Sequence, residues 1–170
     1  LAPILMCSLL NLGNYDKERT STREFELSEN SGNSIENGSI PLRLGLLGLG
    51  TVGTGFVEAV LGSQELSGKL IIKKALVKDL TKIRSTLVSP RILTTDANDI
   101  LSDPEIDVIV EVLGGEFPAV EYMGNAFDAG KHVVTANKEA VAKHGPSLAE
   151  QSHRNRVGFL FEASVGGGMP

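Results

Sequence analysis

The amino-acid sequence predicts an α/β fold in which helices cover both faces of a parallel β-sheet. From Leu42 onward, short apolar runs suited to buried strands alternate with segments whose apolar residues recur at helical spacing. The run Ile106–Val112 is rich in β-branched residues, which is typical of a strand. The 170 residues are 41% hydrophobic and 22% charged, which is enough for one globular domain with a core of its own.

Strands are expected at the short apolar runs along this part of the chain. In order, they are Leu42–Leu47, Leu70–Val77, Ile92–Thr95, Ile106–Val112, His132–Thr135 and Val157–Phe161. Helical segments lie between them, and strands joined by crossover helices run parallel within one sheet. The expected sheet is therefore parallel and covered on both faces.

Helices are expected between these strands. Two are marked by apolar residues at helical spacing, with Phe56, Val57, Val60 and Leu61 in the first, and Tyr122, Ala126 and Phe127 in the second. The second should end at Gly130, because glycine readily takes the left-handed conformation that follows a helix. A short helix is expected around Asp99–Leu101. A last helix starts at about Glu139, and Pro146 predicts a break or restart within it.

Residues 1–41 differ from the rest of the chain. They are rich in Ser, Asn, Glu and Gly and show no sustained apolar period, so we expect a disordered extension before a domain over residues 42–170. No basic region precedes the apolar stretch Leu1–Leu12, and several acids follow it, which argues against a secretory signal or a transit peptide. The chain starts at Leu1 and stops at Pro170 after a glycine run, so we expect a fragment.

Composition argues against several classes of protein. The net charge of −5 gives no basic surface for nucleic acid or an anionic membrane. The apolar runs are shorter than the roughly 18 residues that a membrane span needs. The single cysteine, Cys7, excludes an internal disulfide framework and fits a reducing compartment such as the cytoplasm.

A glycine motif points to a dinucleotide cofactor. Gly48 to Gly53 match G-x-G-x-x-G, with a buried strand before the motif and an amphipathic helix after it, as the fingerprint requires. Gly48 permits a tight turn, Gly50 lets the backbone approach a pyrophosphate, and Gly53 lets helix pack on strand. The free amides at the start of the helix, from Thr51 and Val52, face the phosphates. The motif therefore favours a doubly wound Rossmann-type sheet that binds NAD or NADP over a glycine-rich turn without a ligand.

The end of the second strand bears on the choice between NAD and NADP. An acid at this position accepts the ribose hydroxyls of NAD, whereas a cation pairs with the 2′-phosphate of NADP. The sequence offers both, Lys78 followed by Asp79. Both residues could also be solvated parts of a turn, so the preference stays open.

Three later segments extend the glycine motif into a family resemblance. They are Val110–Gly115, Gly130–Lys138 and Phe161–Pro170. Together with Gly48–Gly53, in this order and spacing, they resemble homoserine dehydrogenase. The resemblance covers Arg43–Pro170.

The resemblance implies an activity that this chain does not complete alone. Members of the family interconvert L-homoserine and L-aspartate 4-semialdehyde with NAD(P), on the route to threonine, methionine and isoleucine. Their substrate site and catalytic residues lie in a second α/β domain, which is expected after Pro170. We therefore expect no catalytic residue and no homoserine oxidation from residues 1–170 alone, and a homo-oligomer when the protein is full length.

Further cofactor residues follow from position and from the resemblance. Gly114 and Gly115 follow the fourth expected strand at the carboxyl edge of the sheet, where open α/β sheets bind ligands. Lys138 follows the next strand at the same edge, and the matching lysine of the family contacts the nicotinamide cofactor. A lysine that opens a helix is electrostatically unfavourable, which favours function over a surface role. Asn137 is expected to cap that helix.

The resemblance also implies a monovalent cation, sodium, near the end of the chain. Glu162 would give a carboxylate oxygen, and Val165, Gly167 and Met169 would give backbone carbonyl oxygens, which hard cations prefer. The alternative is that backbone amides satisfy Glu162. The histidines lack metal-ligand spacing and are expected to be structural or exposed; they are His132, His144 and His153.

Two alternatives remain beside homoserine dehydrogenase. Members of the glucose-fructose oxidoreductase group also carry a Gly-Lys-His-Val strand, but they usually continue with Glu-Lys-Pro, where this chain has Ala136, Asn137 and Lys138. A non-catalytic dinucleotide-sensing module would need neither Lys138 nor the Glu162 loop. Fusion to an upstream kinase is not excluded, although the acidic extension favours the monofunctional form.

Overall fold

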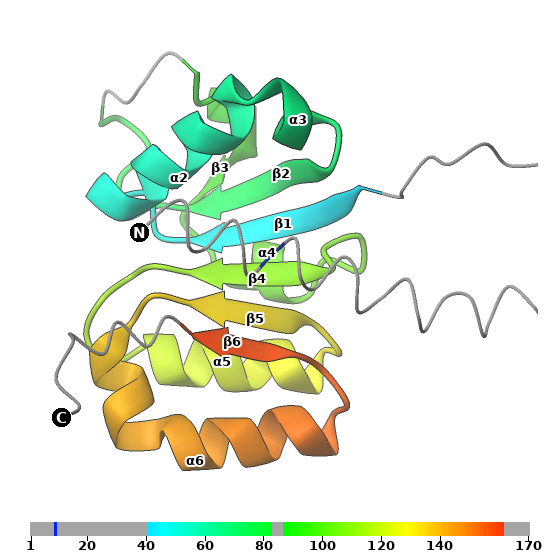
Figure 1. The fold of residues 1–170 in the computed structure, drawn as a ribbon. Helices are drawn as coiled ribbons and strands as arrows, with labels where there is room; N and C mark the ends of the chain where they lie inside the picture. Colours follow the sequence, from blue (N-terminus) through cyan, green and yellow to red (C-terminus); the bar gives the residue numbers. More distant parts are fainter. Residues whose placement is uncertain (1–8, 10–40, 83–86, 162–170) are drawn as a thin grey trace, which may run out of the picture.

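The computed structural model describes Leu9, residues 41–82 and residues 87–161. Within these residues a six-stranded sheet has the order β3-β2-β1-β4-β5-β6. All five neighbouring pairs are parallel. The chain builds the sheet outward from β1 in one direction and then, from β4, in the other, which makes the fold doubly wound (Figure 1). The predicted Rossmann-type fold is confirmed.

All the predicted strands are present, most of them shorter than expected. They are β1 (Leu42–Leu47), β2 (Leu70–Leu76), β3 (Leu93–Thr94), β4 (Val108–Glu111), β5 (His132–Thr135) and β6 (Phe159–Phe161). The prediction was wrong about the start of β4 at Ile106, because the Ile106 amide donates to the carbonyl of Asp103 in a turn that precedes the strand. The apolar side chain of Ile106 is nevertheless buried in the core.

The predicted helices are also present. They are α2 (Thr51–Gly62), α4 (Asn98–Leu101), α5 (Ala119–Asp128) and α6 (Lys138–Arg154), to which the structure adds α3 (Gln64–Ser67) and a 3-10 turn at Pro90–Ile92. Gly130, just beyond α5, has φ of +73° and forms the predicted glycine stop. None of the helices described is long and apolar enough to cross a lipid bilayer.

The predicted break at Pro146 is wrong, because α6 runs through the proline as one helix. A proline inside a helix removes a hydrogen bond and crowds the preceding turn. On either side of it, Ala140 and Leu148 are buried in the same apolar cluster. Tertiary packing of this face therefore holds α6 together where the local sequence predicts an end.

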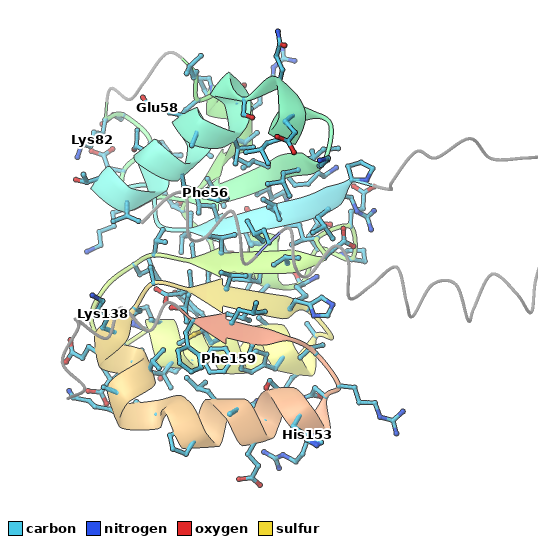
Figure 2. All side chains as sticks on the ribbon, viewed as in Figure 1. Phe56, Glu58, Lys82, Lys138, His153 and Phe159 are labelled. Carbon is cyan, nitrogen blue, oxygen red and sulfur yellow. The ribbon has the colours of Figure 1, made fainter. Side chains whose placement is uncertain are left out.

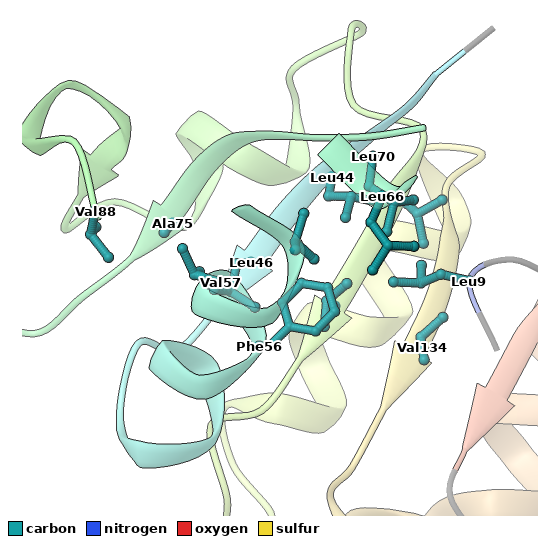
Figure 3. Packing of buried hydrophobic residues seen from close by; sticks show 13 residues of the cluster. Leu9, Leu44, Leu46, Phe56, Val57, Leu66, Leu70, Ala75, Val88 and Val134 are labelled. Atoms are coloured by element: carbon teal, nitrogen blue, oxygen red, sulfur yellow. The ribbon is translucent and has the colours of Figure 1, made fainter. Parts of the chain in front are cut away.

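Two apolar clusters cover the two faces of the sheet. One joins α2 and α3 to the strands, with Phe56 and Val57 at its centre (Figure 3). The other joins α4, α5 and α6 to the opposite face. Residues of β4 alternate between them, because Val108 belongs to the first cluster and Ile109 to the second. Packing on both faces holds the strands in place, and the loops at their carboxyl ends remain to form a site.

Leu9 is the described residue of the predicted N-terminal extension. Its side chain is 0% exposed and packs in the first cluster, near Val134 and Leu66 (Figure 3). At Leu9 the structure therefore differs from a solvated tail. Residues 1–8 and 10–40 lie outside the described residues, so the domain division at residue 41 stays a prediction.

Candidate functional site

Two glycines of the turn after β1 are needed by the fold itself. Gly48 has φ of +105°, a conformation that side chains rarely adopt. A Cβ on Gly53 would overlap the carbonyl oxygen of Gly48, so α2 and the turn touch through backbone atoms. Both residues are buried. Their identities are therefore explained by the close approach of α2 to the turn.

Gly50 has no such structural reason to be glycine. It is exposed, its φ of −84° suits any residue, and no atom lies within 4 Å of the position that a Cβ would take. The space over its backbone is open at the carboxyl edge of the sheet. The turn therefore requires glycine at Gly48 and Gly53, whereas glycine at Gly50 leaves room for a ligand.

The first turn of α2 offers free hydrogen-bond donors beside Gly50. The amide of Thr54 donates to the Gly50 carbonyl at 2.8 Å, which closes the first helical turn. No side chain caps the helix and no acid lies in its first turn. Among the described residues no acceptor is recorded for the amides of Thr51, Val52 and Gly53. Free amides at the positive end of a helix form a site for an anion such as phosphate.

Lys78 and Asp79 follow β2 at the same edge of the sheet, and both are exposed. The Asp79 carboxylate accepts hydrogen bonds from the Thr81 amide at 2.8 Å and from its hydroxyl at 2.7 Å, so it shapes its own turn. Within the described chain no ion pair is recorded for the Lys78 ammonium. Of the two residues that the sequence offers, Asp79 is engaged within its own turn, and Lys78 is exposed without a recorded ion pair among the described residues.

Gly114 and Gly115 form the loop that leaves β4. Their φ angles are +75° and +77°, so two consecutive left-handed residues turn the chain, which glycine alone does without strain. Both are exposed, and a Cβ on either would project into open space. The side-chain amide of Asn137 donates to the Gly115 carbonyl at 2.6 Å and ties the loop to the start of α6.

Asn137 and Lys138 begin α6. Asn137 is the predicted cap, since its side-chain oxygen accepts a hydrogen bond from the Ala140 amide at 3.1 Å. Lys138, the first residue of the helix, is exposed at the carboxyl edge of the sheet (Figure 2). The described residues provide no hydrogen-bond acceptor or acid recorded as a partner of its ammonium. Its charge lies at the positive end of α6, which disfavours a cation, beside Glu139 in the same first turn.

Glu111 was missed by the sequence analysis. It ends β4 with its side chain 0% exposed. Burial raises the pKa of its carboxyl above the ordinary glutamate value, and hydrogen bonds donated by the Thr135 hydroxyl and the Leu113 amide oppose that rise. A charged residue that ends a run of β-branched residues is the signal in the sequence that could have identified it.

A second group of side chains connects the loop after β4 to α6. Glu116 lies 2.7 Å from the Lys143 ammonium and 2.6 Å from the Nε2 atom of His144, both on α6. Hydrogen bonds from Lys143 first, and then from His144, hold the pKa of Glu116 below its ordinary value. The loop that carries Gly114 and Gly115 is thereby fastened to α6.

At the opposite edge of the sheet, where the strands begin, polar side chains are bonded to the backbone. A hollow of about 310 Å³ lies there, lined by Ile106, Lys131 and His132 among others. The Lys131 ammonium donates to the carbonyls of Asp103 and Ile106, and His132 Nδ1 accepts from the Gly158 amide at 2.8 Å. These polar groups serve the fold, as expected for His132.

The structure brings the cofactor residues expected from sequence to one edge. They are Gly48, Gly50, Thr51, Val52, Gly53, Lys78, Gly114, Gly115 and Lys138, and each follows the carboxyl end of β1, β2, β4 or β5. The order of the sheet reverses between β1 and β4, which is where doubly wound sheets bind ligands. The residues expected to bind a cation lie outside the described residues; they are Glu162, Val165, Gly167 and Met169.

Comparisons with known proteins agree with this geometry. The family model described as homoserine dehydrogenase, NAD binding domain, matches residues 48–162. Homoserine dehydrogenase of Bacillus subtilis (strain 168) is 42% identical over 134 residues, which are 76% of this chain and 31% of that protein. The crystal structure of S. aureus homoserine dehydrogenase at pH 8.5 is 42% identical with a TM-score of 0.68, covering 75% of this chain and 33% of that one. The chain thus spans about a third of the length of these relatives.

The alternative of another oxidoreductase on the same scaffold has weaker support. The structure of the oxidoreductase yvaA from Bacillus subtilis is 19% identical with a TM-score of 0.61, covering 75% of this chain and 36% of that one. At this identity the likeness concerns the fold alone.

Proposed function

Because this chain belongs to the homoserine dehydrogenase family, we propose that it forms the cofactor-binding part of an enzyme that interconverts L-homoserine and L-aspartate 4-semialdehyde with NAD or NADP. The observation that carries the proposal is the open first turn of α2. There the amides of Thr51, Val52 and Gly53 have no recorded acceptor among the described residues, and open space lies over Gly50. Free amides at a helix N-terminus are what a dinucleotide pyrophosphate needs.

The other residues of the edge fit the rest of such a cofactor. Lys78 would pair with a 2′-phosphate, because it follows β2, where the adenosine ribose is bound in this fold. Gly114 and Gly115 would lie against the cofactor, since they present backbone without side chains. Lys138 would direct its ammonium toward the cofactor or the reacting oxygen, and a negative partner there would relieve its unfavourable place at the start of α6.

When bound, NAD(P) supplies the hydride acceptor for alcohol oxidation and the hydride donor for the reverse reaction. The protein contributes by holding the cofactor in one orientation. Preorganised donors and a fixed backbone reduce the loss of freedom that productive binding requires. The close packing of α2 on its turn and the hydrogen bond from Asn137 to the Gly115 carbonyl support this role.

The function is tested on the full-length protein by following nicotinamide absorbance with L-homoserine and NADP⁺ or NAD⁺. We expect reduction of the nucleotide that depends on homoserine, and oxidation of NADPH or NADH that depends on aspartate semialdehyde. Saturable nucleotide binding with no turnover in either direction would contradict the enzyme and favour the dinucleotide-sensing module.

Lys78→Ala tests whether Lys78 recognises the 2′-phosphate of NADP. A charge-assisted hydrogen bond contributes roughly 1.5–3 kcal/mol, so we expect the Kd for NADPH to rise by about tenfold or more. The Kd for NADH should change little. Titration of both reduced cofactors measures the difference, with Lys69→Ala as the control because Lys69 pairs with Glu65 just before β2, at the other edge of the sheet. Equal losses for NADPH and NADH would show that Lys78 does not read the phosphate.

The proposal extends to a sodium ion bound by Glu162 with backbone oxygens of Val165, Gly167 and Met169. A carboxylate and carbonyl oxygens form the donor set that a hard cation prefers. We expect Glu162→Gln in the full-length protein to raise the sodium concentration needed for activity, because the substitution removes the charge and keeps the shape. A sodium titration with potassium as the control measures this, and identical curves for both proteins would leave Glu162 without a cation role.

A further inference from the structure

Glu111 lies beneath the proposed cofactor site as a buried carboxyl group. Its neighbours along β4, Val110 and Ile109, are core residues, and the Glu111 side chain itself is 0% exposed. Among the described residues the structure records no cation paired with it. Its environment is therefore the apolar core on one side and the loops of the carboxyl edge on the other.

Every recorded partner of this carboxyl donates a hydrogen bond to it. The Leu113 amide donates at 2.7 Å and the Thr135 hydroxyl donates to the other oxygen. The donors belong to the loop after β4 and to the end of β5, so one carboxyl joins two segments of the site.

The hydrogen bonds continue from these donors to the groups that face the cofactor. The Thr135 hydroxyl oxygen accepts from the Asn137 amide at 3.0 Å. Asn137 in turn donates to the Gly115 carbonyl at 2.6 Å and caps the helix that begins with Lys138. A displacement of the Glu111 carboxylate would therefore disturb both the glycine loop and the start of α6.

Placing a carboxylate at this position costs folding free energy. An ionised group without a paired cation loses hydration on burial, and the raised pKa of Glu111 reflects that loss. Packing alone would favour an apolar residue at the end of a buried strand. Residues that break a packing rule in this way are expected at functional sites.

We propose that Glu111 is a positioning residue of the cofactor site, which fixes the Gly114–Gly115 loop against the start of α6 in the arrangement that receives NAD(P). This inference rests on the proposed function, because it assigns a role within the same site. Glu111 acts through Thr135 and Asn137 and does not touch the cofactor itself.

Glu111→Gln tests the proposal in the full-length protein. The substitution keeps the size of the side chain but replaces one acceptor oxygen with an NH₂ group that faces donors. We expect the Kd for NADPH, measured by fluorescence titration, to rise about tenfold, or about 1.4 kcal/mol. The matched control is Glu121→Gln, the same chemical change at an exposed residue of α5, which should bind NADPH as wild type does.

A pair of Thr135 variants tests the same hydrogen bonds with Glu111 in place. Thr135→Val removes the hydroxyl at nearly constant shape, and Thr135→Ser keeps it. We expect Thr135→Val to weaken NADPH binding severalfold and Thr135→Ser to restore it to near the wild-type value. This pair decides the question if Glu111→Gln does not fold.

The effects of Glu111→Gln and Lys138→Ala should also be non-additive, because Glu111 acts partly by placing the residue that Lys138→Ala removes. If Glu111→Gln or Thr135→Val lowers only the unfolding temperature and binds NADPH as wild type does, Glu111 is a core residue and the inference is overturned. A wild-type protein that binds neither NADPH nor NADH would overturn the proposed function itself, and this inference with it.

Discussion

Gly53→Ala is expected to destabilise the domain by about 3 kcal/mol or more, which lowers the Tm by roughly 6 to 12 °C. The reason is steric, because the added Cβ overlaps the Gly48 carbonyl oxygen and neither atom belongs to a flexible side chain. Relief requires α2 to move away from β1, and the apolar contacts of Phe56 and Val57 move with it. Thermal unfolding followed by circular dichroism measures the change.

The matched control for Gly53→Ala is Gly55→Ala, two residues further along α2. No atom lies within 4 Å of a Cβ built on Gly55, and alanine favours a helix by about 1 kcal/mol over glycine. The Tm of Gly55→Ala should therefore equal or exceed that of the wild type. Equal Tm values for the two variants would contradict the close packing of α2 on the turn.

Gly50→Ala is expected to leave the fold intact and to weaken cofactor binding by about 100-fold, or about 2.7 kcal/mol. The φ of Gly50 suits alanine, and a Cβ there meets no protein atom within 4 Å, so the stability should change by less than about 1 kcal/mol. The methyl group instead occupies the space in which a pyrophosphate would approach the amides of α2. NADPH titration together with thermal unfolding separates the two effects.

Gly55→Ala serves again as the control for Gly50→Ala, since it adds the same methyl group to the same helix away from the free amides. It should bind NADPH as wild type does. If Gly50→Ala also binds NADPH with unchanged affinity, the cofactor does not approach the backbone at Gly50, and the role given to the first turn of α2 is wrong.

The features that sequence predicts well rest on local rules. The glycine stop at Gly130 and the cap at Asn137 depend on residues within one helical turn, and both were confirmed. The turn at Gly48 is likewise a local requirement for a positive φ. Strand existence was also predicted correctly, because a short stretch rich in apolar residues marks each strand.

The features that sequence predicts poorly depend on contacts between distant segments. The hydrogen bonding of Glu111 became visible only when the fold placed Thr135, 24 residues away, against its carboxylate. The helix through Pro146 is held by packing on the sheet, which the local sequence does not reveal. Burial of Leu9 has the same origin, since its neighbours Leu66 and Val134 lie far along the chain.

The central claim is that the carboxyl edge of the sheet around α2 binds a nicotinamide dinucleotide. It is tested most directly by titrating NADPH, and in a second series NADH, into the isotopically labelled 170-residue chain and following the backbone amides by NMR. We predict saturable shifts that are largest for Gly50, Thr51, Val52 and Gly53, with little change at Lys131 on the opposite edge. Shifts that do not saturate with either nucleotide, or that cluster around Lys131 and leave α2 unchanged, would contradict the account.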